Sequence, residues 1–166
     1  MGTTSSERYI PSLNQWITDA NVPVALYDLF GYETGPSLLL PDGRAMFFGS
    51  TGNTAFYTPS GNNSQGTWSA GPVIPNNHGC PDAPGAMMVD GKIIFSSAPS
   101  PSSTATLWKG PVSFYEFDYT NNSYTQITFS GNQTTMADTA FNTVMIDFPD
   151  GNVLMTEAGT YNYFIH

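Results

Sequence analysis

Short apolar runs separated by turn residues recur along the chain. Within residues 38–59, three runs of about five residues are separated by Asp42-Gly43 and by a break at Gly49 and Gly52. An Asp-Gly pair between apolar runs is a strong hairpin signal. Five residues is a usual strand length and is too short for an independent helix. The pattern predicts consecutive antiparallel strands, and no window has a sustained helical stripe, so we expect an all-β fold.

The same pattern occurs three times. The segment TGPSLLLPDGRAMFFGS (34–50) aligns with DAPGAMMVDGKIIFSSA (82–98) at a shift of 48 residues. A third copy, ADTAFNTVMIDFPDGNVLMTEAG (137–159), follows after a short insertion. The Asp-Gly turns begin at Asp42, Asp90 and Asp150. A period of about 50–60 residues is typical of four-stranded propeller blades.

The second half of each repeat has a tyrosine strand and then another aromatic strand. The third copy lacks this half, whereas the N-terminal segment ERYIPSLNQWITD has it. These aromatic pairs are Tyr57 and Trp68, Tyr115 and Tyr124, and Tyr9 and Trp16. We therefore predict one domain, residues 1–166, of three four-stranded blades. Two blades are 24–76 and 77–131, and in the split blade the strands within 7–20 pair with those within 137–159.

These residues resemble the kelch-like propeller of the galactose oxidase and glyoxal oxidase superfamily. In that superfamily an aliphatic strand, an Asp-Gly turn, a small-residue break, a tyrosine strand and a tryptophan strand recur in each blade. The resemblance covers about residues 8–159 and implies a propeller. The sequence departs from the strict kelch pattern because Gly49-Ser50 stands where a double glycine is usual. Copper radical oxidases of the superfamily need two histidine ligands, and no such pair occurs here at blade positions.

Three blades are too few to close a ring, since propellers typically have four to eight. Two copies would give a six-bladed propeller, in which each N-terminal half-blade completes the C-terminal half-blade of the other copy. We therefore predict a homodimer. The alternative is that the chain is a piece of a longer propeller.

Composition and charge limit the classes of partner that the protein is expected to bind. The 166 residues are 14% aromatic and 10% charged, with 16 Gly and 13 Pro, which suits short strands and tight turns. A net charge of −9 with four Lys and Arg argues against binding to nucleic acid or anionic membranes. No apolar run approaches the roughly 20 residues that span a bilayer, and MGTTSSERY lacks the order of a signal peptide. Glycosylation sequons fit an extracellular protein, but the compartment stays open.

Candidate binding residues lie in loops that lead from one blade to the next and in one long loop within a blade. In a propeller such loops meet near one end of the channel. These residues are Tyr32, Glu33, His78, Asp82, Trp108 and Asp138. The repeated carboxylates of Glu33, Asp82 and Asp138 predict a weak preference for a divalent cation or a cationic ligand.

The spacing His78-x-Cys80-x-Asp82 also permits a metal site. We favour structural roles for these three residues, because a metal usually needs three or four ligands and only one histidine is nearby. No cofactor is otherwise expected.

The sequence thus predicts a non-catalytic propeller module that self-assembles and binds a glycan, a protein or a cation. The alternative is an enzyme, either an oxidase of the superfamily or a glycan hydrolase, with its site on the channel axis.

Overall fold

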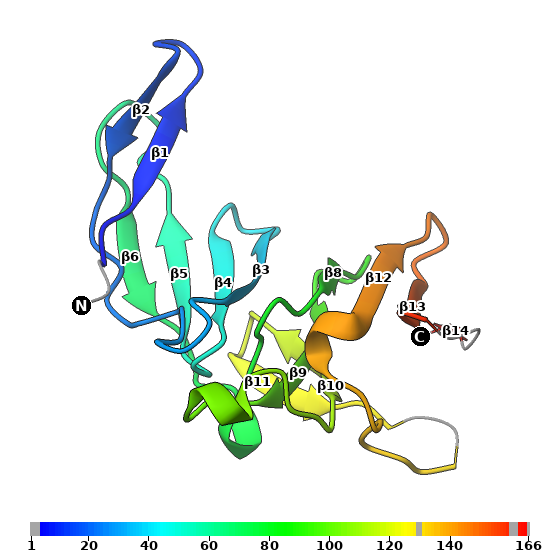
Figure 1. The fold of residues 1–166 in the computed structure, drawn as a ribbon. Helices are drawn as coiled ribbons and strands as arrows, with labels where there is room; N and C mark the ends of the chain where they lie inside the picture. The colour runs from blue at the N-terminus through cyan, green and yellow to red at the C-terminus, as the bar shows by residue number, and fades with distance from the viewer. Residues whose placement is uncertain (1–3, 129–130, 160–162, 166) are drawn as a thin grey trace.

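The computed structural model describes residues 4–128, 131–159 and 163–165 (Figure 1). These residues form antiparallel sheets and short 3₁₀ turns, with no α-helix among them. The 3₁₀ turns are η1 (Pro75–Asn77), η2 (Thr104–Thr106) and η3 (Ala140–Asn142). No helix in these ranges is long and apolar enough to cross a bilayer. The predicted all-β class is confirmed.

Two four-stranded meanders form the centre of the molecule. The first sheet consists of β3 (Thr34–Leu39), β4 (Ala45–Gly49), β5 (Thr54–Thr58) and β6 (Thr67–Ala70), in that order. The second sheet consists of β8 (Gly85–Met87), β9 (Ile93–Pro99), β10 (Ser113–Asp118) and β11 (Ser123–Gln126), also in chain order. The short β7 (His78–Gly79) pairs with the far end of β9.

Two smaller sheets lie at the ends of the chain. The third sheet consists of β12 (Thr143–Asp147), β13 (Val153–Glu157) and β14 (Tyr163–Ile165). The N-terminal hairpin consists of β1 (Glu7–Ile10) and β2 (Gln15–Thr18).

The three Asp-Gly turns have the same geometry. The carboxylates of Asp42, Asp90 and Asp150 accept hydrogen bonds from the N–H two residues later, at 3.0, 3.0 and 3.1 Å. The glycines that follow have φ of +87°, +86° and +92°, a region that glycine adopts without steric cost. The Asp-Gly turns therefore recur in the structure with one geometry, as they recur in the sequence.

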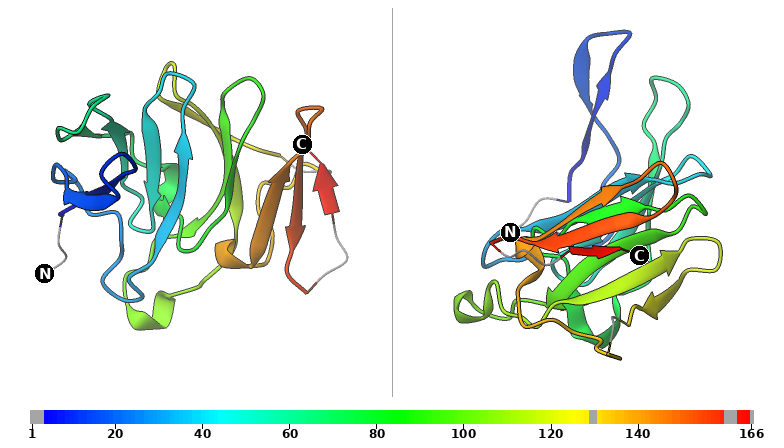
Figure 2. Two further views of the ribbon diagram at one scale, coloured as in Figure 1. Left: turned by 90° about the horizontal axis from the view of Figure 1, so that it is seen from above. Right: turned by 90° about the vertical axis from the view of Figure 1, so that its right-hand side faces the viewer.

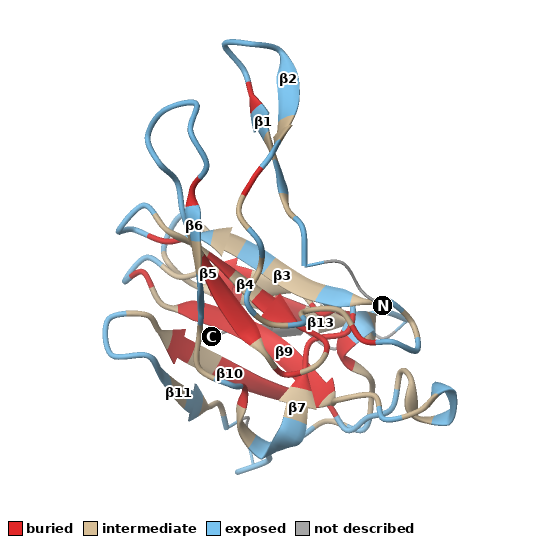
Figure 3. Ribbon diagram, turned by 90° about the vertical axis from the view of Figure 1, so that its left-hand side faces the viewer, coloured by how far each residue is buried: buried red, intermediate tan, exposed pale blue. Residues whose placement is uncertain are grey.

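The three sheets pack face to face in series (Figure 2). Between the first and second sheets, the rings of Phe48 and Phe95 are 4.5 Å apart and those of Phe56 and Phe117 are 6.3 Å apart. Burial is greatest in β4, β5, β9 and β10, which belong to the first and second sheets (Figure 3). The main core is therefore the junction between the first and second sheets.

A second junction joins the second and third sheets. Ala86 and Ile94 form a buried cluster with Val153. Beside it, the buried hydroxyl of Thr143 donates a hydrogen bond to that of Ser96 at 2.8 Å. The most extensive contacts between sheets join neighbours in the series, and the described residues form an open arc (Figure 2).

The N-terminal hairpin and the third sheet lie at opposite ends of this arc (Figures 1 and 2). The hairpin is held on the outer strands of the first sheet: Tyr57 donates a hydrogen bond to Asp19, and the indole N–H of Trp68 donates one to Ser6 at 3.1 Å. In the single chain, therefore, the strands within 7–20 do not pair with those within 137–159.

The third sheet obtains its third strand from its own chain. β14 pairs with β13 in register from Leu154 to Thr156. This differs from the expectation that another copy supplies that strand. The reason is local: closing the short connection between β13 and β14 costs less chain entropy than recruiting a distant segment. Pairing of the hairpin with a second copy stays a prediction.

Candidate functional site at the loop end of the sheets

The connections between sheets lie at one end of the strands, and the Asp-Gly turns lie at the other. We call the end with the connections the loop end. A four-stranded antiparallel meander starts and finishes at the same end, so successive meanders place their connecting loops together. The long loop within the second sheet lies there too. A Cβ at Gly31 would be 3.1 Å from a side-chain carbon of Leu107, and the ring of Trp108 lies edge-on to that of Phe141 at 4.9 Å. Loops of all three sheets thus meet at this end.

Asp28 organises the loop that precedes the first sheet. Its carboxylate is buried and accepts hydrogen bonds from the N–H groups of Phe30, Gly31 and Glu33 at 2.7, 2.6 and 3.1 Å. The hydroxyl of Ser50 donates a fourth at 3.0 Å. Burial by itself would raise the pKa of Asp28, but these hydrogen bonds outweigh it and lower the pKa. Asp28 therefore stays charged and fixes the position of Glu33.

Glu33 and Asp82 come together from two successive connecting loops. Burial, a hydrogen bond with Asp82 and the charges of Asp82 and Asp28 raise the pKa of Glu33 to about 7. Asp82 has φ of +49°, which aspartate tolerates better than most residues. Glu33 therefore holds a proton to a higher pH than an ordinary glutamate does. The structure thus joins two of the three acidic residues predicted to lie close together.

Asp138, the third acidic residue, belongs to a different cluster. Its carboxylate accepts hydrogen bonds from the N–H of Thr139 at 2.7 Å and from the amide of Asn142 at 2.9 Å. Burial and the charge of Asp138 raise the pKa of Glu157, at the end of β13. Asp138 therefore stabilises the start of the third sheet.

The three suggested metal ligands are not brought together. His78 is half-buried, with its Nδ1 3.1 Å from the hydroxyl of Ser97, and burial lowers its pKa. Cys80 is completely buried in the main core, which raises the pKa of its thiol. In the part of the chain that the structure describes, no group of three His, Cys, Asp or Glu side chains could hold a metal ion. The second histidine of the chain, His166, lies outside that part.

The two predicted aromatic residues differ in exposure. Tyr32 is 72% exposed, and its ring stacks on that of Tyr27 at 6.2 Å. Trp108 is half-buried against Phe141. Tyr32 is thus the more accessible ring for a ligand, whereas Trp108 helps to join two loops.

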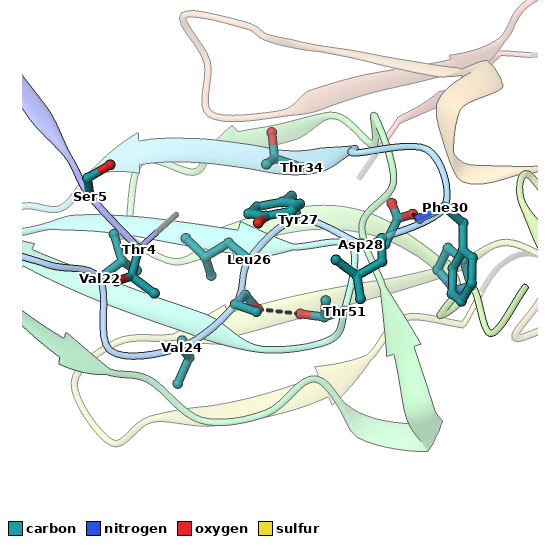
Figure 4. A pocket seen from close by; sticks show the side chains of 13 residues that line it. Thr4, Ser5, Val22, Val24, Leu26, Tyr27, Asp28, Phe30, Thr34 and Thr51 are labelled. Atoms are coloured by element: carbon teal, nitrogen blue, oxygen red, sulfur yellow. Dashed lines mark hydrogen bonds between the residues drawn. The ribbon is translucent and has the colours of Figure 1, made fainter. Parts of the chain in front are cut away.

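A cavity of about 480 Å³ opens beside the same loop (Figure 4). Its apolar wall consists of Val22, Val24, Ala25, Leu26, Tyr27, Leu29, Phe30 and Pro101. The carbonyl of Ala25 is already used, since it accepts a hydrogen bond from Thr51 at 2.7 Å. The sequence pattern did not predict this cavity. The available signal was the apolar segment NVPVALYDLF (21–30), which lies in a loop and not in a strand.

Comparison with protein-family models and with curated proteins finds no match to this chain. The function is therefore inferred from the arrangement of the sheets and loops.

Proposed function

We propose that the chain is a propeller-type, non-catalytic module that associates with a second copy and presents its loop end to a ligand. The observation that supports this proposal is that both junctions are built in the same way. A Cβ at Gly91 would lie 2.9 Å from a side-chain carbon of Pro41, and a Cβ at Gly151 would lie 2.8 Å from one of Val89. Pro41 and Val89 occupy the same position of the repeat. The same contact between neighbouring Asp-Gly turns therefore occurs twice, as expected for consecutive propeller blades.

The loop end, which we propose binds the ligand, carries Tyr32, Glu33 and Asp82. A pair of adjoining carboxyl groups suits a cation or a basic group on a protein or glycan ligand. The net charge of −9 also favours a cationic ligand, because a negatively charged protein repels anions.

Assembly is tested by sedimentation equilibrium over a range of protein concentrations. The proposal expects a dimer mass, and a chain that stays monomeric at every concentration would contradict it. Ligand binding is tested by following the melting temperature during titration with calcium, zinc and copper. We expect an increase that is lost in Asp82→Asn and retained in the matched control Asp138→Asn. No increase with any of the three ions would contradict cation binding.

One observation favours a second candidate function, an acid–base enzyme. A carboxyl group with a pKa of about 7 is suited to proton transfer at neutral pH. However, Glu33 and Asp82 are in hydrogen-bond contact, whereas the two carboxyl groups of glycosidases are about 5–9.5 Å apart. Hydrolysis of a glycan panel by the parent chain but not by Glu33→Gln would favour the enzyme. No turnover by either would favour the binding module.

A further inference from the structure

The two ends of the arc expose opposite faces of the repeat unit. We define the leading face of a sheet as the side toward the following sheet, and the trailing face as the side toward the preceding one. At the main junction, Phe48 on the leading face of the first sheet contacts Phe95 on the trailing face of the second. At the next junction, leading Ile94 packs with trailing Val153. Every junction in the described arc thus joins a leading face to a trailing face.

Among the described residues, no sheet packs on the leading face of the third sheet. When the Asp-Gly turns are aligned, Ile146 corresponds to Ala86 and Leu154 corresponds to Ile94. Ala86 and Ile94 are 4% and 3% exposed, because the third sheet covers them. Ile146 is 56% exposed, and Leu154, its cross-strand partner, is only half-buried. Positions that the repeat buries elsewhere are therefore open here.

The trailing face of the first sheet is open as well. Leu39 on β3 is 71% exposed, and a Cβ at Gly43 would meet nothing within 4 Å. The N-terminal hairpin contacts the outer strands of this sheet, through Tyr57 and Trp68, and leaves the inner strand β3 free.

The cavity also lies where a sheet preceding the first sheet would pack. At the repeat shift of 48 residues, Leu26 corresponds to Ile74 and Tyr32 corresponds to Cys80. Ile74 and Cys80 are fully buried in the main core, where the first sheet's leading face covers them. By contrast, Leu26 lines the cavity (Figure 4) and Tyr32 is largely exposed. The cavity thus corresponds to the core between two sheets, but only one of the two sheets is present.

We propose that the leading face of the third sheet in one copy packs on the trailing face of the first sheet in a second copy and covers the cavity. This inference rests on the proposed self-assembly and specifies the surfaces that form it. The contact that recurs at both internal junctions would then recur between Pro149 of one copy and Gly43 of the other. Two copies related by a two-fold axis form this contact twice, so both open faces of each chain are covered.

A disulfide between the copies tests the contact directly. Within the chain, the Cβ of Pro36 is 3.0 Å from the Cβ position of Gly85, at the junction of the first and second sheets. The equivalent residues between copies are Val144 and Ser37, both exposed in the single chain. Cβ atoms joined by a disulfide are about 3.5–4.5 Å apart, so a small adjustment suffices. Buried Cys80 does not compete for this disulfide.

The experiment uses the single variants Ser37→Cys and Val144→Cys, alone and mixed, under mild oxidation. We expect covalent dimers in the mixture and little crosslinking in either variant alone. The second arm is Gly43→Asn, with Gly61→Asn as the matched control. Both glycines have positive φ, which asparagine tolerates, and both have open space around them in the single chain. We expect Gly43→Asn to weaken the dimer about tenfold or more and Gly61→Asn to leave it unchanged.

The outcomes separate this inference from the proposed function. A dimer by sedimentation that forms no 37–144 crosslink and is insensitive to Gly43→Asn overturns the inference alone, because self-assembly then uses another surface. A chain that is monomeric at every concentration overturns both. Crosslinking in the mixture together with the weaker Gly43→Asn dimer supports both.

Discussion

The main junction and the open end faces contain equivalent repeat positions in different surroundings. Phe95, on the trailing face of the second sheet, is completely buried against Phe48. The equivalent residue on the trailing face of the first sheet, Phe47, is only half-buried and packs on Trp68 of its own sheet. The difference shows that an apolar residue at this position is buried by the neighbouring sheet and not by the other strands of its own sheet. Each end face therefore has the apolar residues of a junction but lacks the partner sheet that would bury them.

The largest effect is expected from truncation at the main junction. Phe95→Ala should lower the free energy of unfolding by about 3–5 kcal/mol, because it leaves a cavity between two packed sheets. Ile146→Ala on the open face should change it by less than about 0.5 kcal/mol in the monomer. Urea unfolding of the two variants at low protein concentration measures both. Equal losses would show that the end face is covered within the single chain.

The glycines of the Asp-Gly turns permit a finer comparison. Gly91→Ala and Gly43→Ala incur the same backbone strain, since φ is +86° and +87°. Only Gly91→Ala also forces a methyl group against Pro41. We expect it to cost about 1–3 kcal/mol more than Gly43→Ala in the monomer. Similar losses in thermal unfolding would mean that Pro41 moves aside.

The carboxyl pair makes the loop end sensitive to pH. The pKa of Glu33 rises from its ordinary 4.5 to about 7 on folding, so the folded state favours the protonated form. This contribution to stability is complete below pH 4.5 and is lost as the pH rises through about 7. The melting temperature should fall as the pH rises from about 4.5 to about 7, by about 2–4 °C for each kcal/mol lost. Glu33→Gln should flatten this part of the profile; an unchanged slope would show that another group titrates.

The smallest effect is expected from salt. Two copies of a chain with a net charge of −9 repel each other, and added salt screens that repulsion. We expect the dimer to tighten a few-fold between low and moderate sodium chloride concentration. Dimer weakening with salt would instead indicate attractive charge pairs across the interface.

Local signals made much of the fold predictable. Asp-Gly turns and five-residue apolar runs depend on interactions within a few residues, so the hairpins around Asp42, Asp90 and Asp150 could be read from the sequence. The meeting of Glu33 and Asp82 followed from the repeat, because equivalent loops must lie at the same end. These inferences required only neighbouring residues and a constant period.

Other features depend on tertiary surroundings that a single sequence does not reveal. Cys80 occurs in a polar loop sequence, yet the close packing of Gly35 against its side chain places it in the core. Which segment becomes the third strand of the third sheet depends on whether β14 or another segment pairs more favourably with the edge of β13. The cavity depends on the path of residues 21–30, which the hydrogen bonds to Asp28 determine.

The serial order of the sheets also bears on how the protein opens. The hydrogen-bonded ladders run within each sheet, whereas the sheets themselves are joined chiefly by side-chain packing. The strand β9 has packed sheets on both sides, while β12 and β13 have one. Such a chain behaves as a row of coupled units, in which the outer unit opens first and the inner one last. Amide hydrogens of β12 and β13 should consequently exchange with solvent faster than those of β9, and dimer formation should slow them selectively.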